Sequence, residues 1–124
     1  MLWIDRNPEG TMPKSKLLIA ILLIGSPMMS QAASFDCDLP DLKPDERAIC
    51  DNRDLNDADV KMVTTLDLLA GLFAMGTRGN MMDQQVTWLH QREACGADVD
   101  CIRDAYDRRQ KQLDDIYQSI DRPI

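Results

Sequence analysis

The sequence has little histidine and no closely spaced cysteine pair, and both absences limit its chemistry. His90 is the only histidine, and the four cysteines do not follow the spacing of zinc-binding motifs, so a zinc site is not expected. No Cys-x-x-Cys pair is present, which argues against a redox-active dithiol. We therefore expect neither a metal nor a cofactor.

Motifs of the common enzyme classes are also missing. The chain has no Gly-x-Ser-x-Gly elbow and no glycine-rich phosphate loop. Aspartate pairs such as Asp98/Asp100 and Asp114/Asp115 are interpreted as helix caps and solvated charges. His90 is interpreted as a surface or packing residue. The sequence thus predicts a protein that is not an enzyme.

The chain also lacks a hydrophobic run long enough to cross a bilayer, which needs about 20 apolar residues. The run Leu17–Ile24 follows Lys14 and Lys16 and ends at a Gly-Ser-Pro break, before small residues at Ser30 and Ala32. This order predicts a secretory signal peptide at residues 1–32, cleaved after Ala32. An uncleaved membrane anchor is the alternative.

The start of the mature chain follows from this signal. Met12 directly precedes it, so translation from Met12, with residues 1–11 not part of the protein, is a second interpretation of the N-terminus. No cysteine stands at the predicted cleavage point, so we do not expect a lipid anchor. The prediction is one small exported domain, residues 33–124, that does not remain inserted in the membrane.

Positive charge is scarce. The net charge is −7, and removing the two acids and three bases of residues 1–32 takes it to −8. This charge disfavours nucleic acid, whose phosphates would be repelled, and favours basic partners through long-range attraction. Plain solubility is the alternative explanation.

The alternation typical of strands is absent, whereas helical periodicity is common. The pattern predicts a short helical turn that Asp45 and Glu46 open favourably, followed by three longer helices and two glycine-containing breaks. These elements are a turn through Cys50, a helix at Leu55–Met75, a break at Gly76–Asn80, a helix at Asn80–Ala94, a break at Gly96–Asp98 and a helix at Val99–Ile120. Helices joined by short loops predict an all-α fold, a small antiparallel helical hairpin or bundle.

Each long helix has an apolar face. The expected faces are Leu55, Ala58, Met62, Thr65, Leu69 and Leu72; then Met82, Val86 and Leu89, beside a strip of Gln85, Trp88 and Arg92; and finally Ile102, Tyr106, Arg109, Leu113, Ile116 and Ile120. Leu68–Met75 is apolar all round, which predicts burial between helices or, alternatively, a patch that binds a partner or a second copy. Arg109 interrupts an apolar face and needs a partner, for which Asp59 is a candidate.

The four cysteines predict two disulfides, because thiols oxidise outside the cytosol. Three pairings are possible. We favour Cys37 with Cys50 and Cys95 with Cys101, because each pair spans a predicted chain reversal. The chain-entropy description gives a stabilisation of about 3 kcal/mol for the first loop and somewhat less for the second.

The chain from Ser34 has a Ser-Phe-Asp-Cys start, the string Glu46-Arg47-Ala48-Ile49-Cys50, and a series of spaced residues. These residues are Leu55, Asp59, Gln85, Trp88, Leu89, Arg92, Cys95, Gly96, Cys101, Tyr106, Arg109 and Leu113. With this pattern the segment from Phe35 to Leu113 resembles the lysozyme-inhibitor LprI-type domain family, which includes YecT-like periplasmic proteins. The family usually has leucine at the position of Ala58 and tyrosine at that of Leu66.

The resemblance implies a periplasmic inhibitor of lysozyme or of an endogenous peptidoglycan hydrolase. Gln85, Trp88, Arg92, Gly96, Tyr106 and Arg109 would be structural residues of such a domain. The family motif does not indicate contact residues. We expect them among acids of the Cys95–Cys101 loop and of the N-terminal arm: Asp98, Asp100, Asp36 and Asp38. The alternative is that these acids are only solvated. The alternative function is an envelope interaction or assembly module, including a homodimer, that uses Leu68–Met75.

Overall fold

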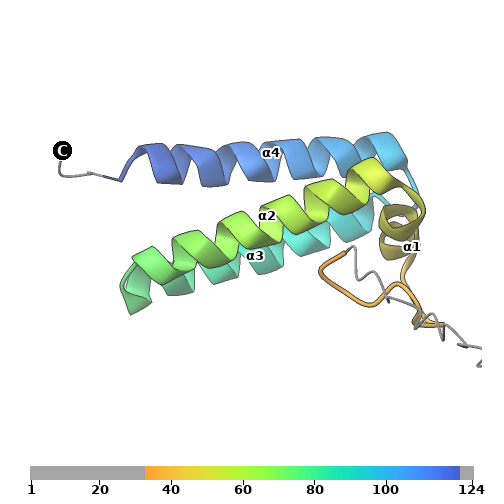
Figure 1. Ribbon diagram of the computed structural model, residues 1–124, viewed down its shortest axis with the longest axis horizontal. Helices are drawn as coiled ribbons and strands as arrows, with labels where there is room; N and C mark the ends of the chain where they lie inside the picture. The colour runs from red at the N-terminus through yellow and green to blue at the C-terminus, as the bar shows by residue number, and fades with distance from the viewer. Residues whose placement is uncertain (1–32, 121–124) are drawn as a thin grey trace, which may run out of the picture.

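The computed structural model describes residues 33–120 as an N-terminal arm followed by four α-helices (Figure 1). The helices are α1 (Pro44–Asp51), α2 (Arg53–Leu72), α3 (Met75–Ala94) and α4 (Val99–Gln118). The expected all-α fold is confirmed. The predicted signal peptide, residues 1–32, lies outside the described residues, as do residues 121–124.

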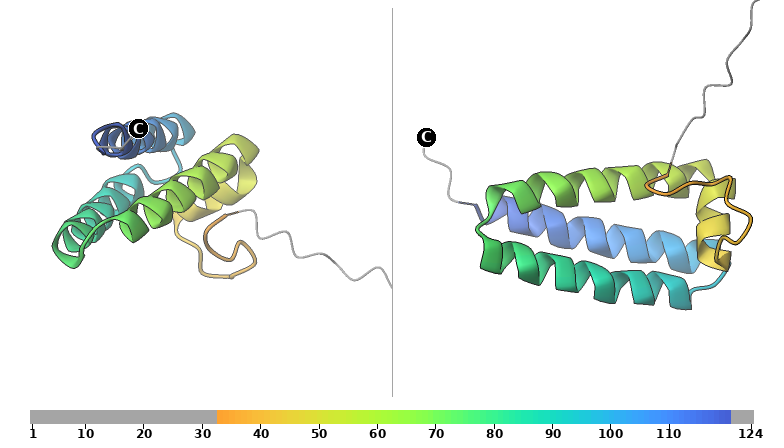
Figure 2. Two further views of the ribbon diagram at one scale, coloured as in Figure 1. Left: turned by 60° about the vertical axis from the view of Figure 1, so that its left-hand side comes forward. Right: turned by 90° about the horizontal axis from the view of Figure 1, so that it is seen from below.

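The three long helices run antiparallel in sequence order, so α2 and α4 point in the same direction (Figure 1). In the oblique view of Figure 2 (left) the three helices lie at the corners of a triangle, and α2 and α4 share the most extensive interface. Helix α1 contacts all three and lies across one end of the bundle. That end also holds the arm and the α3–α4 loop, whereas the α2–α3 turn lies at the opposite end.

Helix α1 begins where its sequence favours a helix start. Pro44 occupies the first helical turn, where its missing amide hydrogen does no harm. The backbone amide of Lys43 donates a hydrogen bond to the Glu46 carboxylate at 2.9 Å, which satisfies a donor at the helix terminus. Asn52 alone separates α1 from α2, and its side chain donates to the Ala48 carbonyl oxygen at 2.7 Å.

The predicted break at Gly76–Asn80 is wrong. These residues form the start of α3, and the turn lies at Phe73 and Ala74, whose ψ angles of 151° and 162° are extended. Glycine permits a left-handed turn but does not require one. Gly76 and Gly79 both have negative φ and lie within α3. Among the described residues, Gly96 is the only glycine with positive φ.

The predicted apolar face of α4 is confirmed at its centre. Ile102, Tyr106, Arg109 and Leu113 are all buried, while Ile116 and Ile120 at the end are half-buried. From α2, Leu55, Met62 and Leu69 reach the same core as predicted. These side chains fill the centre of the triangle and fix the relative positions of α2 and α4.

The expected buried face of α3 is wrong. Met82 is half-buried, and Val86 and Leu89 are 54% and 38% exposed. The core is instead reached by the neighbouring, more polar strip of Met81, Gln85, Trp88 and Arg92. Polar side chains face inwards on α3 because the bundle offers them buried partners.

The burial predicted for Leu68–Met75 holds only in part. Leu69 and Ala70 are buried, but Leu68, Leu72 and Met75 are 69%, 64% and 89% exposed. This end of α2 contacts its neighbours along one face only, so its other apolar side chains reach solvent. The alternative of an exposed apolar patch describes these three residues better.

Candidate functional site

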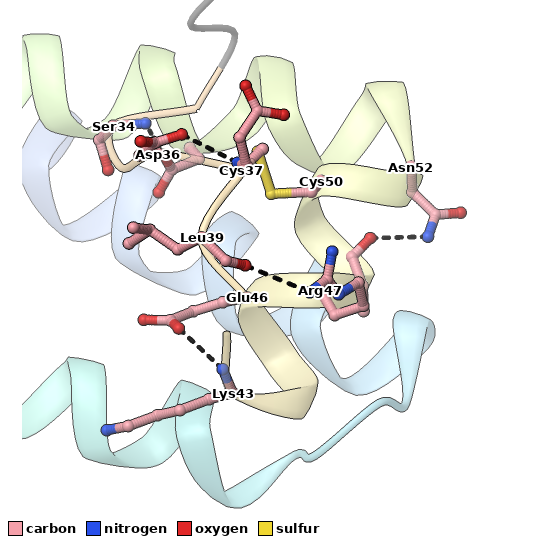
Figure 3. Close-up of a disulfide and its surroundings, with 12 residues drawn as sticks. Ser34, Asp36, Cys37, Leu39, Lys43, Glu46, Arg47, Cys50 and Asn52 are labelled. Carbon is pink, nitrogen blue, oxygen red and sulfur yellow. Dashed lines mark hydrogen bonds between the residues drawn. A yellow bond between two sulfur atoms is a disulfide. The ribbon is translucent and has the colours of Figure 1, made fainter. Parts of the chain in front are cut away.

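Both disulfides lie at the end of the bundle that α1 closes. Cys37 pairs with Cys50, joining the arm to α1 (Figure 3), and Cys95 pairs with Cys101, joining the end of α3 to the first turn of α4. The predicted local pairing is confirmed, and no free cysteine remains in residues 33–120. Each disulfide closes a short loop, and both loops lie at the same end of the bundle.

Further contacts attach the arm to the helices at this end. The Lys43 ammonium lies 2.8 Å from the Glu93 carboxylate on α3, and their hydrogen bond raises the pKa of Lys43 and lowers that of Glu93. The Arg47 guanidinium on α1 donates to the Leu39 carbonyl oxygen of the arm (Figure 3). The arm is thus held by the Cys37–Cys50 disulfide and by these contacts to α1 and α3.

A buried polar network lies beneath this end. Arg92 of α3 donates from Nε to the Asp45 carboxylate of α1 at 2.8 Å and from a terminal nitrogen to the Tyr106 hydroxyl of α4 at 3.1 Å. The Tyr106 hydroxyl donates to Asp59 of α2 at 2.7 Å. All four side chains are nearly inaccessible to solvent. One connected set of polar groups therefore joins all four helices.

The protonation of Tyr106 suits its place in this network. Burial is the main cause of a pKa raised well above the usual range for tyrosine; the Asp59 carboxylate raises it further and Arg92 opposes the change. The hydroxyl therefore stays protonated and donates to Asp59. Trp88 packs on Tyr106 with ring centroids 5.0 Å apart and donates from its indole nitrogen to the Ala105 carbonyl oxygen.

Aromatic rings enclose the Arg92 guanidinium. Its central carbon lies 5.8 Å from the ring centroid of Phe35 in the arm and 5.7 Å from that of Trp88. Such cation–π contacts are worth more in a desolvated site than at the surface. Arg92 thus links the arm to the same network as the helices.

The predicted pairing of Arg109 with Asp59 is wrong. Arg109 donates to Gln85 at 3.0 Å and to Gln112 at 3.2 Å, while the Asp59 carboxylate accepts from the Tyr106 hydroxyl and the Ser34 amide. Burial lowers the pKa of Arg109, since its hydrogen-bond partners are uncharged. Gln85 also donates to the Met62 sulfur at 3.5 Å, so this second network again joins α2, α3 and α4.

The six residues expected to be structural are found in these arrangements. Gln85, Trp88, Arg92, Tyr106 and Arg109 are buried and interact as described. Gly96 has φ of 57° in the α3–α4 loop, a left-handed conformation that glycine adopts without strain. Most of these six residues therefore help to hold the helices together.

The four acids expected to contact a partner are all exposed. Asp38, Asp98 and Asp100 lie between paired cysteines, and Asp36 directly precedes Cys37. Three of the four acids have structural roles as well. Asp36 accepts a hydrogen bond from the Asp38 amide at 2.8 Å, Asp98 caps α4 by accepting from the amides of Asp100 and Cys101, and Asp100 lies 2.7 Å from Arg103. Among residues 33–120, no hydrogen bond or ion pair engages the Asp38 carboxylate.

Sequence reasoning missed Asp45 as a core residue. Its position in the first turn of α1 suggested an exposed acid facing the helix dipole, yet it is 1% exposed and paired with Arg92. The two residues are 47 positions apart, so no local pattern connects them. The buried pair became visible only when the fold brought α1 against α3.

Two grooves lie away from the disulfide end. One of about 630 Å³ runs between α3 and α4 and is lined by residues that include Trp88, Gln91, Arg109 and Gln112. A smaller one of about 310 Å³ lies between α2 and α4, beside Leu68 and Leu72. The first has a mixed polar and apolar lining that includes Arg109, and the second is mainly apolar.

The described part of the chain holds no group of three or more histidine, cysteine, aspartate or glutamate residues placed to bind a metal. His90 is exposed on α3 and lies 3.9 Å from Glu93. None of the four helices in residues 33–120 is long and apolar enough to span a membrane.

Comparisons with protein-family models, curated proteins and solved structures gave no match to this chain.

Proposed function

We propose that this chain is an exported protein inhibitor of lysozyme or of a related peptidoglycan hydrolase, and that it acts by docking rather than by catalysis. The observation that carries the proposal is the disulfide end of the bundle, where exposed acids lie on two covalently closed segments. The sequence resemblance described above names the enzyme class. Export and a periplasmic location are parts of the same proposal.

The charge of this end suits a basic enzyme. Asp36, Asp38 and Asp41 lie on the arm, while Asp98 and Asp100 lie on the α3–α4 loop and the start of α4. Many lysozymes are basic, and opposite charge raises the rate of association. Glycan-cleaving hydrolases work with carboxylates in a cleft, so a protein that covers that cleft blocks the reaction.

The rigidity of this end favours docking. Each segment is closed by a disulfide, and the arm is further held by Lys43 and Arg47. A surface that is already ordered loses less conformational entropy on binding. The exposed acids can therefore meet a partner without first being ordered.

The first experiment measures lysis. The purified domain, residues 33–124 with both disulfides formed, is mixed with a basic lysozyme or with an endogenous hydrolase, and the clearing of a cell-wall suspension is followed. The proposal predicts slower clearing by at least one of the two enzymes, with saturation near equimolar inhibitor. Unchanged clearing by both enzymes at a large excess of the domain contradicts it.

A second experiment tests which surface docks. The double variant Asp38→Asn/Asp100→Asn removes two charges from the disulfide end without removing the α4 cap. The control, Asp67→Asn/Asp83→Asn, removes two exposed charges from α2 and α3, away from both disulfides. We expect about five- to tenfold weaker inhibition from the first variant only. Equal weakening by both would mean that net charge, and not this surface, determines binding.

Self-association is a second candidate function, favoured by a specific observation. Leu68, Leu72 and Met75 are strongly exposed at the α2–α3 end, and the first two line the apolar groove beside α4. Clustered exposed apolar side chains typically mark an interaction surface. This end lies opposite the disulfides, so a dimer formed there leaves the acidic surface accessible (Figure 1).

Light scattering distinguishes this candidate. It predicts a dimer for the wild type and a folded monomer for Leu72→Asp. The matched control is Val86→Asp, which places the same charge at an exposed apolar position of α3 and should leave a dimer. A wild-type monomer at high protein concentration excludes self-association through this patch.

A further inference from the structure

The first described residue of the chain is buried. Ala33 is only 7% exposed and belongs to the hydrophobic core cluster. The next backbone amide, of Ser34, donates a hydrogen bond to the Asp59 carboxylate on α2 at 2.6 Å. The arm is held in this position by the Cys37–Cys50 disulfide a few residues later (Figure 3). The predicted cleavage site thus lies where the chain enters the core.

Asp59 is a buried carboxylate with a shortage of positive charge. Its two close hydrogen-bond donors, the Tyr106 hydroxyl and the Ser34 amide, are both uncharged. The Arg92 guanidinium lies 3.8 Å away and makes its short contact, at 2.8 Å, with Asp45 instead. Two buried carboxylates therefore share one guanidinium, and a buried charge is stable only when it is well compensated.

The other buried cation does not correct this imbalance. Arg109 donates to the neutral side chains of Gln85 and Gln112 and to the Met81 carbonyl oxygen. Within residues 33–120, Asp59 forms no ion pair with any cation other than Arg92. The site beside Asp59 therefore suits one further positive group.

We propose that cleavage between Ala32 and Ala33 supplies this group, because the new α-ammonium of Ala33 forms a buried ion pair with Asp59. The cleavage is the hydrolysis expected of a signal peptidase. One water is consumed, the bond between the Ala32 carbonyl carbon and the Ala33 nitrogen breaks, and the products at neutral pH are a carboxylate and an ammonium. The proposal rests on the proposed export signal and not on hydrolase inhibition.

Covalent geometry places the new charge within reach. Adjacent backbone nitrogens are separated by at most about 4 Å, and the nitrogen of Ser34 already contacts Asp59. Rotation about one bond of Ala33 therefore brings its ammonium towards the carboxylate without moving the arm. Before cleavage the same nitrogen belongs to an uncharged amide. Removal of the signal peptide thus completes the core of the mature domain.

The test compares three oxidised forms of residues 33–124, each checked by intact mass. One begins at Ala33 with a free amine, one is acetylated at that amine, and one carries a single additional glycine before Ala33. Thermal unfolding at pH 6 is measured for each, in the wild type, in Asp59→Asn and in the control Asp67→Asn, an exposed acid on the same helix.

The proposal predicts that the free Ala33 form unfolds about 5 °C or more above the other two. This difference should persist in Asp67→Asn and disappear in Asp59→Asn. Equal midpoints for the three wild-type forms overturn the proposal, and so does a difference that survives in Asp59→Asn. If Asp59→Asn does not fold, the three wild-type forms still decide the question. No hydrolase is needed, so failure here is distinct from failure of the proposed inhibition.

Discussion

Arg92 and Arg109 are both buried in the bundle, but their surroundings differ. Arg92 lies against two carboxylates, one of them at 2.8 Å, whereas Arg109 is hydrogen-bonded to uncharged groups. Removing one partner of a buried ion pair leaves an unpaired charge, which is more destabilising than leaving a neutral acceptor unpaired. The two arginines should therefore respond differently to the same substitution.

We predict that Arg92→Met lowers the free energy of unfolding by about 3–5 kcal/mol. Arg109→Met, which exposes only neutral acceptors beside a groove, should lower it by about 1–2 kcal/mol. Urea unfolding of the oxidised domain, monitored by circular dichroism, measures both values. If the two variants lose the same free energy of unfolding, the negative charges of Asp45 and Asp59 do not depend on Arg92 for stabilisation.

At the residue scale, the sequence pattern predicts which side chains are important more reliably than it predicts their hydrogen-bond and ion-pair partners. Arg109 was correctly singled out as a charge within an apolar stripe, but its partner was Gln85 and not Asp59. Asp59 and Tyr106 lie 47 positions apart, as do Arg92 and Asp45. Pairing over such separations depends on helix packing, which local periodicity does not specify.

At the scale of elements, the start of α3 is the clearest departure from expectation. Two glycines in its first turns suggested a loop, but the chain reverses at Phe73 and Ala74, which carry no turn signal. Space is open around both glycines, since beyond the neighbouring helix backbone an added Cβ at Gly76 or Gly79 would have no heavy atom within 4 Å. Their helical conformation therefore has a direct consequence for substitution.

We predict that Gly79→Ala raises the free energy of unfolding by about 0.5–1 kcal/mol, because alanine loses less backbone entropy in a helix. The matched control is Gly96→Ala, where φ of 57° makes an added Cβ unfavourable by about 1 kcal/mol or more. Thermal or urea unfolding measures the two changes. Destabilisation by Gly79→Ala would place this glycine in a turn and shorten α3.

Other elements followed directly from the sequence. The four- and three-residue steps of α4 predicted its buried face, because one apolar side packs against two helices and the other side faces water. The disulfides followed from short separations of 13 and 6 residues across chain reversals. The buried face of α3 could not be predicted from the sequence, because several of its inward side chains are polar and form hydrogen bonds only with residues far away in the sequence.

At the scale of the whole molecule, the disulfide end is also joined by ion pairs between distant parts of the chain. Arg103 on α4 lies 2.6 Å from Asp54 in the first turn of α2, and Lys43 lies 2.8 Å from Glu93. The hydrogen bond from Arg103 lowers the pKa of Asp54. Because the folded-state pKa is lowered, the stabilisation is present above the unfolded value near 3.9 and is lost as pH falls through the folded value.

We predict that Arg103→Gln raises the pKa of Asp54 towards its ordinary value. Carboxyl chemical shifts followed by NMR from pH 7 to pH 2 measure this change. Arg108→Gln, on the exposed side of α4, is the control and should leave the titration of Asp54 unchanged. An unaltered Asp54 titration in Arg103→Gln would mean that this ion pair does not hold the two helices together in solution.

The two disulfides underlie both the ordered acidic end and the buried position of Ala33 at the start of the arm. Peptide mapping by mass spectrometry, on protein recovered from the cell envelope with its thiols blocked at once, tests their formation most directly. We predict a chain that begins at Ala33, with Cys37 linked to Cys50 and Cys95 linked to Cys101. Blocked free thiols at these four cysteines in the recovered protein would contradict it.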